Sequence, residues 1–308
     1  MSGEPASTTG SQQTPPEDDP VQSPRTAERP PDEPGGHRGG HPGECPPEHA
    51  AEQVELPTSP VRQLEIAFAD WMASVARRAH TLDLPDIPLP ISALAPPRQS
   101  NEDYRRPGGR PALGIPGIWE TWRMIEPWGK ALHDAGYDVH LLPQLDAMSA
   151  PIDELAHTVS TYVGALGLQD VVLFGHSKGG LVSKAVMGGP EGWRIAGLLA
   201  FATPWDGAPI AGLVPADSTR ELLPDSPTIA RLAADTATNA RIVQIEATWD
   251  QNVPHVVLEG AQHMTLPLLG HSTMLDSEDV AQLLVELAGQ VPRAATVTKS
   301  TTTSHRKS

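Results

Sequence analysis

The sequence lacks the features that would place it in several specialised protein classes. It has one cysteine, Cys45, in 308 residues, so no disulfide can form within the chain. It has no apolar run long enough to cross a bilayer, and we expect no stable membrane span. Its net charge of −16 leaves no basic surface to displace phosphate counterions, so we expect no nucleic-acid partner.

The N-terminal end also lacks the pattern of a secretory signal. A basic stretch followed by an apolar segment and a cleavage site of small residues is not found there. Together with the single cysteine, this predicts a cytoplasmic protein, although export by another route would leave no such signal. The composition carries no information about the oligomeric state.

The first 60 residues differ in composition from the rest of the chain. They are rich in Pro, Gly, Ser and Thr, and they carry eleven acidic residues against three arginines. Such a segment cannot bury enough apolar surface to offset the entropy of ordering it, so residues 1–60 are predicted to be a disordered acidic tail. The Thr/Ser-rich residues 292–308 are interpreted as a second disordered tail.

Four metal-ligand residue types recur at every fourth position of the acidic tail: His37, His41, Cys45 and His49. On a helix this spacing would align their side chains on one face, where they could bind a metal ion. The glycines and prolines between them disfavour a helix, so we interpret the spacing as coincidental.

Residues 61–98 are predicted to form an amphipathic helix followed by a Pro-rich connector. The apolar residues of the helix recur at helical spacing: Leu64, Phe68, Trp71, Met72, Val75 and Ala79. This apolar face either packs on the flank of a domain or docks a partner or a lipid surface. We favour packing, because the segment is not basic enough to bind anionic lipid.

Residues 110–290 alternate between strand-like and helix-like segments. The predicted strands span residues 111–115, 137–142, 171–174, 195–201, 241–246 and 256–258. The predicted helices span residues 122–135, 152–166, 179–187 and 276–287. This alternation predicts an α/β domain with a mostly parallel sheet and helices on both faces. Residues 205–240 interrupt the alternation and have the length of a short cap over the strand ends.

The most informative motif is the sequence Gly175-His176-Ser177-Lys178-Gly179. It follows the apolar strand 171–174 directly and precedes a helix. A serine on such a strand-to-helix turn projects its hydroxyl from the end of the sheet, and the glycines avoid a collision with neighbouring backbone. Ser177 is therefore the predicted nucleophile. The side chain of His176 is expected to point away from it and to have a structural role.

A serine hydroxyl needs a general base, which a carboxylate orients. In this architecture the expected chain order is serine, then an acid, then a histidine, and Asp250 and His271 lie where that order requires. We prefer Asp250 as the acid, and we prefer His271 to His263 as the base because His271 follows an apolar run and a glycine. The less favoured acids are Asp206, Asp225 and Asp276.

Two backbone amides are expected to bind the oxyanion of the reacting ester. One is the amide of Lys178 at the start of the helix, and the other is that of Ile118, with Trp119 as the alternative. A Pro-Gly turn without a catalytic role is also compatible with the loop that contains Ile118. The ammonium of Lys178 could raise the potential near the oxyanion or reach solvent, and we favour solvent.

Taken together, these segments resemble the α/β-hydrolase superfamily and, within it, the bacterial esterase/lipase group. The resemblance covers about residues 110–287 and rests on several separated motifs. These are Ile115-Pro116-Gly117, Gly175–Gly180, Ala202-Thr203-Pro204, Leu223–Pro227, Asp250–Pro254 and Gly270-His271. It implies an α/β-hydrolase fold and the hydrolysis of carboxylic esters through an acyl-serine, without a metal or an organic cofactor.

Two other functions remain compatible with the sequence. The same three residues could serve an acyltransferase or a thioesterase, or the domain could be a catalytically silent binding protein. The apolar residues of the predicted cap suggest an apolar acyl ester as the substrate: Pro209, Ile210, Leu213, Val214, Leu222 and Leu223. They do not indicate the length of the acyl chain.

Overall fold

The computed structural model describes residues 54–81, 99–145, 147–214 and 216–293. The predicted connector over residues 84–98 lies entirely outside this part of the chain. The same holds for the predicted tails, apart from residues 54–60 and 292–293, and for His37, His41, Cys45 and His49. The predictions for these segments therefore stay predictions.

A six-stranded sheet forms the centre of the described domain, and all its strand pairs are parallel. Its strand order is β2-β1-β3-β4-β5-β6. In chain order the strands are β1 (Pro111–Ile115), β2 (Asp138–Leu141), β3 (Val171–His176), β4 (Ile195–Phe201), β5 (Ile242–Trp249) and β6 (Gln262–Leu269). Because β3 is central and buried on both faces, its residues 171–174 are continuously apolar.

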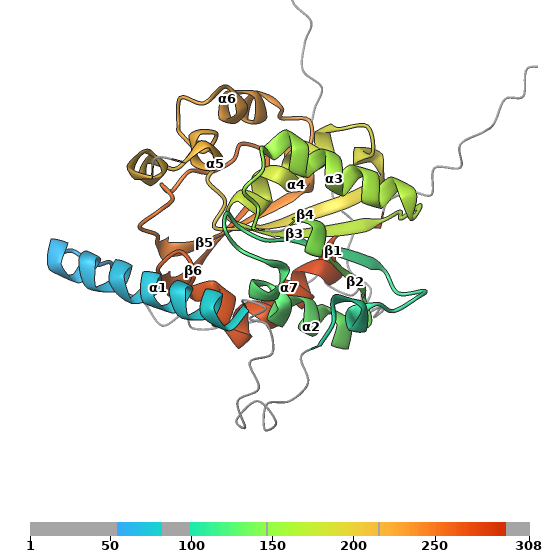
Figure 1. The fold of residues 1–308 in the computed structure, drawn as a ribbon, viewed down its shortest axis with the longest axis horizontal. Coiled ribbons are helices and arrows are strands. Elements are labelled where there is room, and N and C mark those ends of the chain that lie inside the picture. Colours follow the sequence, from blue (N-terminus) through green and yellow to red (C-terminus); the bar gives the residue numbers. More distant parts are fainter. Residues whose placement is uncertain (1–53, 82–98, 146, 215, 294–308) are drawn as a thin grey trace, which may run out of the picture. The chain divides into compact units, whose positions relative to one another are not determined.

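Helices cover both faces of this sheet (Figure 1). Helices α3 (Ile152–Ala165) and α4 (Lys178–Gly188) lie on one face, while α2 (Glu126–Asp134) and α7 (Glu278–Gln290) lie on the other. The alternation of strand side chains divides the core accordingly: Leu173 belongs to the first layer and Phe174 to the second. The predicted fold class is confirmed.

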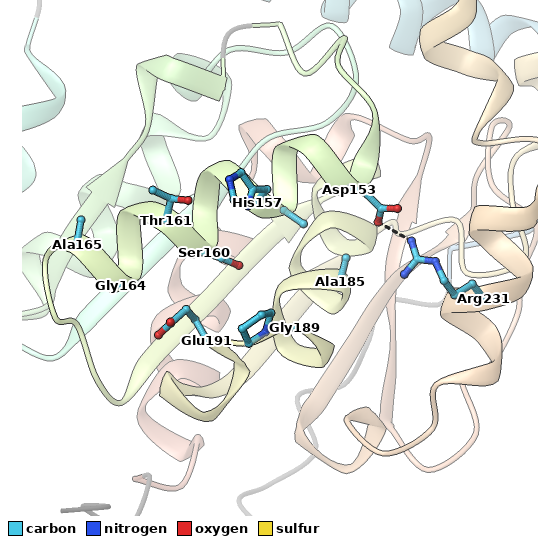
Figure 2. A pocket seen from close by; sticks show the side chains of 12 residues that line it. Asp153, His157, Ser160, Thr161, Gly164, Ala165, Ala185, Gly189, Glu191 and Arg231 are labelled. Carbon is cyan, nitrogen blue, oxygen red and sulfur yellow. Dashed lines mark hydrogen bonds and ion pairs between the residues drawn. The ribbon is translucent and has the colours of Figure 1, made fainter. Parts of the chain in front are cut away.

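A surface cavity of about 570 Å³ lies along the outer sides of α3 and α4, where Figure 2 shows its lining side chains. Asp153 of α3 and Arg231 of α6 (Pro227–Ala234) form an ion pair of 2.5 Å at its rim. None of the residues that line this cavity is a predicted site residue.

One predicted strand is wrong. Residues 256–258 form no strand, and the sixth strand is β6, which begins four residues later. Two features hid β6 from sequence analysis: none of its residues is fully buried, and it contains Pro267. Proline is tolerated there because β6 is an edge strand of the sheet.

Between β4 and β5 the chain forms short helical segments in place of a regular crossover helix. They are η6 (Pro209–Leu213), α5 (Asp217–Arg220), α6 and η7 (Asn239–Arg241). Ser226 caps α6 by accepting hydrogen bonds from the amides of Thr228 and Ile229. This insertion occupies the residues predicted to form the cap.

The N-terminal helix α1 (Pro60–Thr81) docks through its polar residues, contrary to our expectation. Asp70 is 4% exposed, whereas Leu64, Phe68 and Trp71 on the apolar face are 58–72% exposed. The polar face docks because the domain offers it hydrogen-bond donors, which a buried carboxylate requires. No helix in the described part of the chain is long and apolar enough to cross a membrane.

Candidate active site

Ser177 stands on a sharp turn between β3 and α4. Its backbone is in a region that side chains rarely adopt, with φ 53° and ψ −123°. The turn is held by a 2.8 Å hydrogen bond from the Ser177 amide to the Phe201 carbonyl. A Cβ at Gly179 would lie 2.6 Å from the carbonyl oxygen of Pro116, so only glycine allows this close approach to the loop after β1.

The structure brings His271 and Asp250 to this serine. His271 Nε2 lies 3.0 Å from Ser177 Oγ, and His271 Nδ1 lies 2.7 Å from Asp250 Oδ2. Asp250 directly follows β5, and His271 lies two residues beyond the end of β6. Because parallel strands end at the same edge of the sheet, residues distant in sequence meet there.

The electrostatics of this pair favour a charged imidazole beside a charged carboxylate. Burial alone would lower the pKa of His271, but the charge and hydrogen bond of Asp250 offset burial and raise that pKa. Burial would raise the pKa of Asp250, but the charge of His271 and hydrogen bonds from His271 and the amides of Asn252 and Val253 lower it. The pair can therefore hold a proton taken from Ser177.

The alternative residues from sequence analysis lie elsewhere. Asp206 and Asp225 are exposed, and the exposed Asp276 pairs with Arg77 of α1. His263 lies within β6 and contacts Glu246, 3.3 Å away. None of these contacts involves Ser177.

A second histidine–carboxylate pair lies beside the first, with the ring centroids of His176 and His271 5.0 Å apart. His176 Nδ1 is 3.0 Å from both carboxylate oxygens of Glu120, and His176 Nε2 lies 3.2 Å from the backbone carbonyl of His271. Glu120 Oε2 also accepts a 2.6 Å hydrogen bond from the Gly117 amide. His176 thus links the loop after β1 to the loop that carries His271.

Sequence analysis missed Glu120. The only sequence signal is a carboxylate in an otherwise apolar loop, and no spacing rule connects it with His176, which lies 56 residues away. The side chain is 5% exposed. Burial would raise its pKa, but the charge of His176 and hydrogen bonds from His176 and the Gly117 amide lower it.

Helix α1 also holds the loops that carry the site. Asp70 Oδ1 accepts a 2.8 Å hydrogen bond from the Ser272 amide, and Asp70 Oδ2 accepts one of 2.6 Å from Gln251 Nε2. Gln251 Oε1 in turn accepts a hydrogen bond from the His271 amide at 3.2 Å. Sequence analysis missed Asp70, because helical spacing places it only among the polar residues of an amphipathic helix and gives no sign of a distant partner.

The two expected oxyanion residues belong to adjoining segments. Ile118 follows β1, and the Gly179 backbone packs against the carbonyl groups of this loop. The Gly117 amide is already bound to Glu120, which leaves Ile118 and Trp119 as the next amides in the loop. Lys178 is the first residue of α4, where an amide has no acceptor within the helix.

The expectation that the Lys178 ammonium reaches solvent is wrong. The side chain is completely buried, and Nζ donates hydrogen bonds to the carbonyls of Met148, at 3.1 Å, and Ala150, at 2.7 Å. Both carbonyls belong to the segment just before α3, so the ammonium joins this segment to the start of α4. Burial lowers the pKa of Lys178 to about 8.

Comparison with known proteins identifies the fold. No model of a protein family and no curated protein matches the chain. Aspergillus fumigatus lipase B is 16% identical over 62% of this chain and 55% of that one, with a TM-score of 0.50. A Bacillus licheniformis lipase in mature form is 12% identical, covering 60% and 94% of the two chains (TM-score 0.48). An extracellular α/β-hydrolase from a Paenibacillus species is 17% identical, covering 59% and 99% (TM-score 0.43). From its parallel sheet with helices on both faces and the match at a TM-score of 0.50, the chain has the α/β-hydrolase fold.

Proposed function

We propose that this protein is a serine hydrolase that cleaves carboxylic esters through an acyl-serine intermediate. The observation that carries the proposal is the continuous chain of hydrogen bonds from Ser177 through His271 to Asp250. The strained backbone of Ser177 at the start of a helix supports it. In this proposal Ser177 is the nucleophile, His271 the general base, and Asp250 orients the imidazole.

The first half of the reaction forms the acyl-enzyme. His271 Nε2 takes the hydroxyl proton while Ser177 Oγ attacks the ester carbonyl, and the carbonyl oxygen becomes an oxyanion. The amides of Lys178 and Ile118 donate hydrogen bonds to this oxyanion. When the tetrahedral intermediate collapses, the carbon–oxygen bond to the alcohol breaks, and His271 protonates the departing alkoxide.

The second half releases the acid. A water molecule loses a proton to His271 and attacks the acyl carbon, and His271 returns a proton to Ser177 as the acyl–serine bond breaks. Throughout, Asp250 stabilises the charged imidazole. No step requires a group other than these side chains, the two amides and water.

The insertion between β4 and β5 supports an apolar acyl group in the substrate. Ile210, Leu213 and Val214 of this insertion are 37–81% exposed, although large apolar side chains are normally buried. An acyl chain placed along them would remove their apolar surface from water. We therefore include an apolar acyl ester in the proposal.

Hydrolysis of p-nitrophenyl esters of increasing acyl length tests this function. We expect turnover by the wild type, none by Ser177→Ala, and unchanged turnover by the control Ser160→Ala, whose serine lies on α3. Acyl-CoA cleavage, or ester formation with an added alcohol that exceeds hydrolysis, would favour the thioesterase or the acyltransferase. Equal turnover by wild type and Ser177→Ala would refute the proposal.

A further inference from the structure

Strands β5 and β6, at one edge of the sheet, carry polar side chains on a face where apolar core residues would be expected. Gln244 and Glu246 of β5 point to the face that α3 and α4 cover elsewhere, while Ile245 and Ala247 point to the α7 side. In the parallel register Gln244 pairs with His263 of β6. Glu246 and His263 therefore lie diagonally across neighbouring strands on one face.

A third side chain joins them from the loop between β5 and β6. His255 Nδ1 and His263 Nε2 both contact Glu246 Oε2. One ligand atom from each of Glu246, His255 and His263 lies within 4.8 Å of the other two. The two imidazole rings have centroids 5.3 Å apart.

Gln244 holds the Glu246 carboxylate in place through its other oxygen, Oε1. Glu246 Oε1 accepts a hydrogen bond from Gln244 Nε2, which also donates to the Val256 carbonyl, while Gln244 Oε1 accepts from the Leu258 amide at 2.9 Å. Gln244 is completely buried. A buried amide that orients a ligating carboxylate is the arrangement found around protein metal sites.

The negative charge of Glu246 and the exposure of the two histidines both suit the binding of a cation. The Glu246 side chain is 9% exposed, and a buried carboxylate needs positive charge beside it. Of the two imidazoles, His263 is 24% exposed and His255 is 60% exposed, so an ion can enter from solvent. Two nitrogens and a carboxylate oxygen are ligands that Zn²⁺ prefers.

We propose that Glu246, His255 and His263 form a Zn²⁺ site at the β5–β6 edge. Bonds of about 2.0–2.2 Å place the ligand atoms of a tetrahedral site roughly 3.4 Å apart, and the three ligand atoms here lie within 4.8 Å of one another. Three protein ligands leave the fourth position to water. The ion would fasten the loop of residues 251–261, which begins after Asp250, to both strands.

Titration of the metal-stripped full-length protein with Zn²⁺, followed by calorimetry, tests this site. We expect His255→Ala and His263→Ala each to weaken one binding event by at least about tenfold. The controls are His157→Ala, an exposed histidine on α3, and a variant with alanine at His37, His41, Cys45 and His49. Both controls should retain this binding event. Co²⁺ bound in its place should show tetrahedral absorption bands.

Two results would overturn the proposal. One is a wild type that binds no Zn²⁺ at submillimolar concentration, and the other is unchanged Zn²⁺ affinity in both histidine variants. Because His255 is largely exposed, its alanine variant is expected to fold, which circular dichroism would verify. The readout is independent of ester hydrolysis, so the metal site and the proposed function can fail separately.

Discussion

Two histidine–carboxylate pairs lie side by side in this molecule, with ring centroids of His176 and His271 5.0 Å apart. Both have Nδ1 against a buried carboxylate: Asp250 for His271 and Glu120 for His176. They differ at Nε2, which faces the Ser177 hydroxyl in His271 and a backbone carbonyl in His176. A carboxylate partner alone therefore does not make a general base.

The partner of the second nitrogen distinguishes the two pairs. The Ser177 hydroxyl can donate its proton to Nε2 of His271, whereas the backbone carbonyl beside Nε2 of His176 has no proton to donate and can only accept a hydrogen bond. In our proposal His271 moves protons while His176 joins two loops. The following predictions test this difference, from the largest expected effect to the smallest.

Removing the base should have the largest effect. In His271→Ala we expect kcat/KM for an activated ester to fall by about 10⁴-fold to 10⁶-fold, because Ser177 loses its proton acceptor. Steady-state kinetics would measure this loss, with circular dichroism as the check on folding. A loss below tenfold in a folded variant would contradict the role of His271.

Replacing the acid should change both rate and pH dependence. In Asp250→Asn we expect kcat to fall by about 10⁴-fold, because the amide favours the wrong imidazole tautomer. Wild-type activity should rise with pH through the raised pKa of His271, since only the neutral imidazole accepts a proton. Without the Asp250 charge, the midpoint of the residual activity should move to lower pH. An unchanged midpoint would argue against this pairing.

Breaking the second pair should mainly reduce stability. His176→Ala leaves Glu120 as a buried carboxylate without its partner, which costs about 3–5 kcal/mol of unfolding free energy. Urea denaturation would measure this cost, and His157→Ala, on the surface of α3, is the matched control. Folded His176→Ala should keep far more activity than His271→Ala. Equal losses of activity would erase the distinction between the two pairs.

Removing the hydrogen bonds that Asp70 of α1 accepts should give the smallest of these effects. Asp70→Ala removes the acceptor for the Ser272 amide and for Gln251, so we expect kcat to fall by about tenfold to hundredfold with KM little changed. The midpoint of the pH profile should also move down, since the Asp70 charge helps to raise the pKa of His271. The exposed Glu65 of the same helix provides the control, Glu65→Ala. A purely structural contact would leave the pH midpoint unchanged.

Chain order and local pattern were sufficient to predict much of the fold. The apolar strand before Ser177 and the glycines around it define a local turn, and the alternation of strands and helices defines the parallel sheet. Chain order also points to Asp250 and His271, and the structure brings both to Ser177.

The remaining features depend on contacts between distant segments, which local patterns do not encode. Glu120 meets His176 across 56 residues, and Asp70 meets Ser272 across 202. The burial of Lys178 likewise depends on two carbonyls of another segment. The strand β6 was missed because an edge strand with a proline resembles a loop in sequence.

Labelling with an organophosphonate ester, followed by mass spectrometry of the intact protein and its peptides, tests the central claim most directly. We predict one adduct per chain, attached to Ser177, much slower labelling of His271→Ala, and no labelling of Ser177→Ala. An adduct on another residue, or undiminished labelling of Ser177→Ala, would contradict the account.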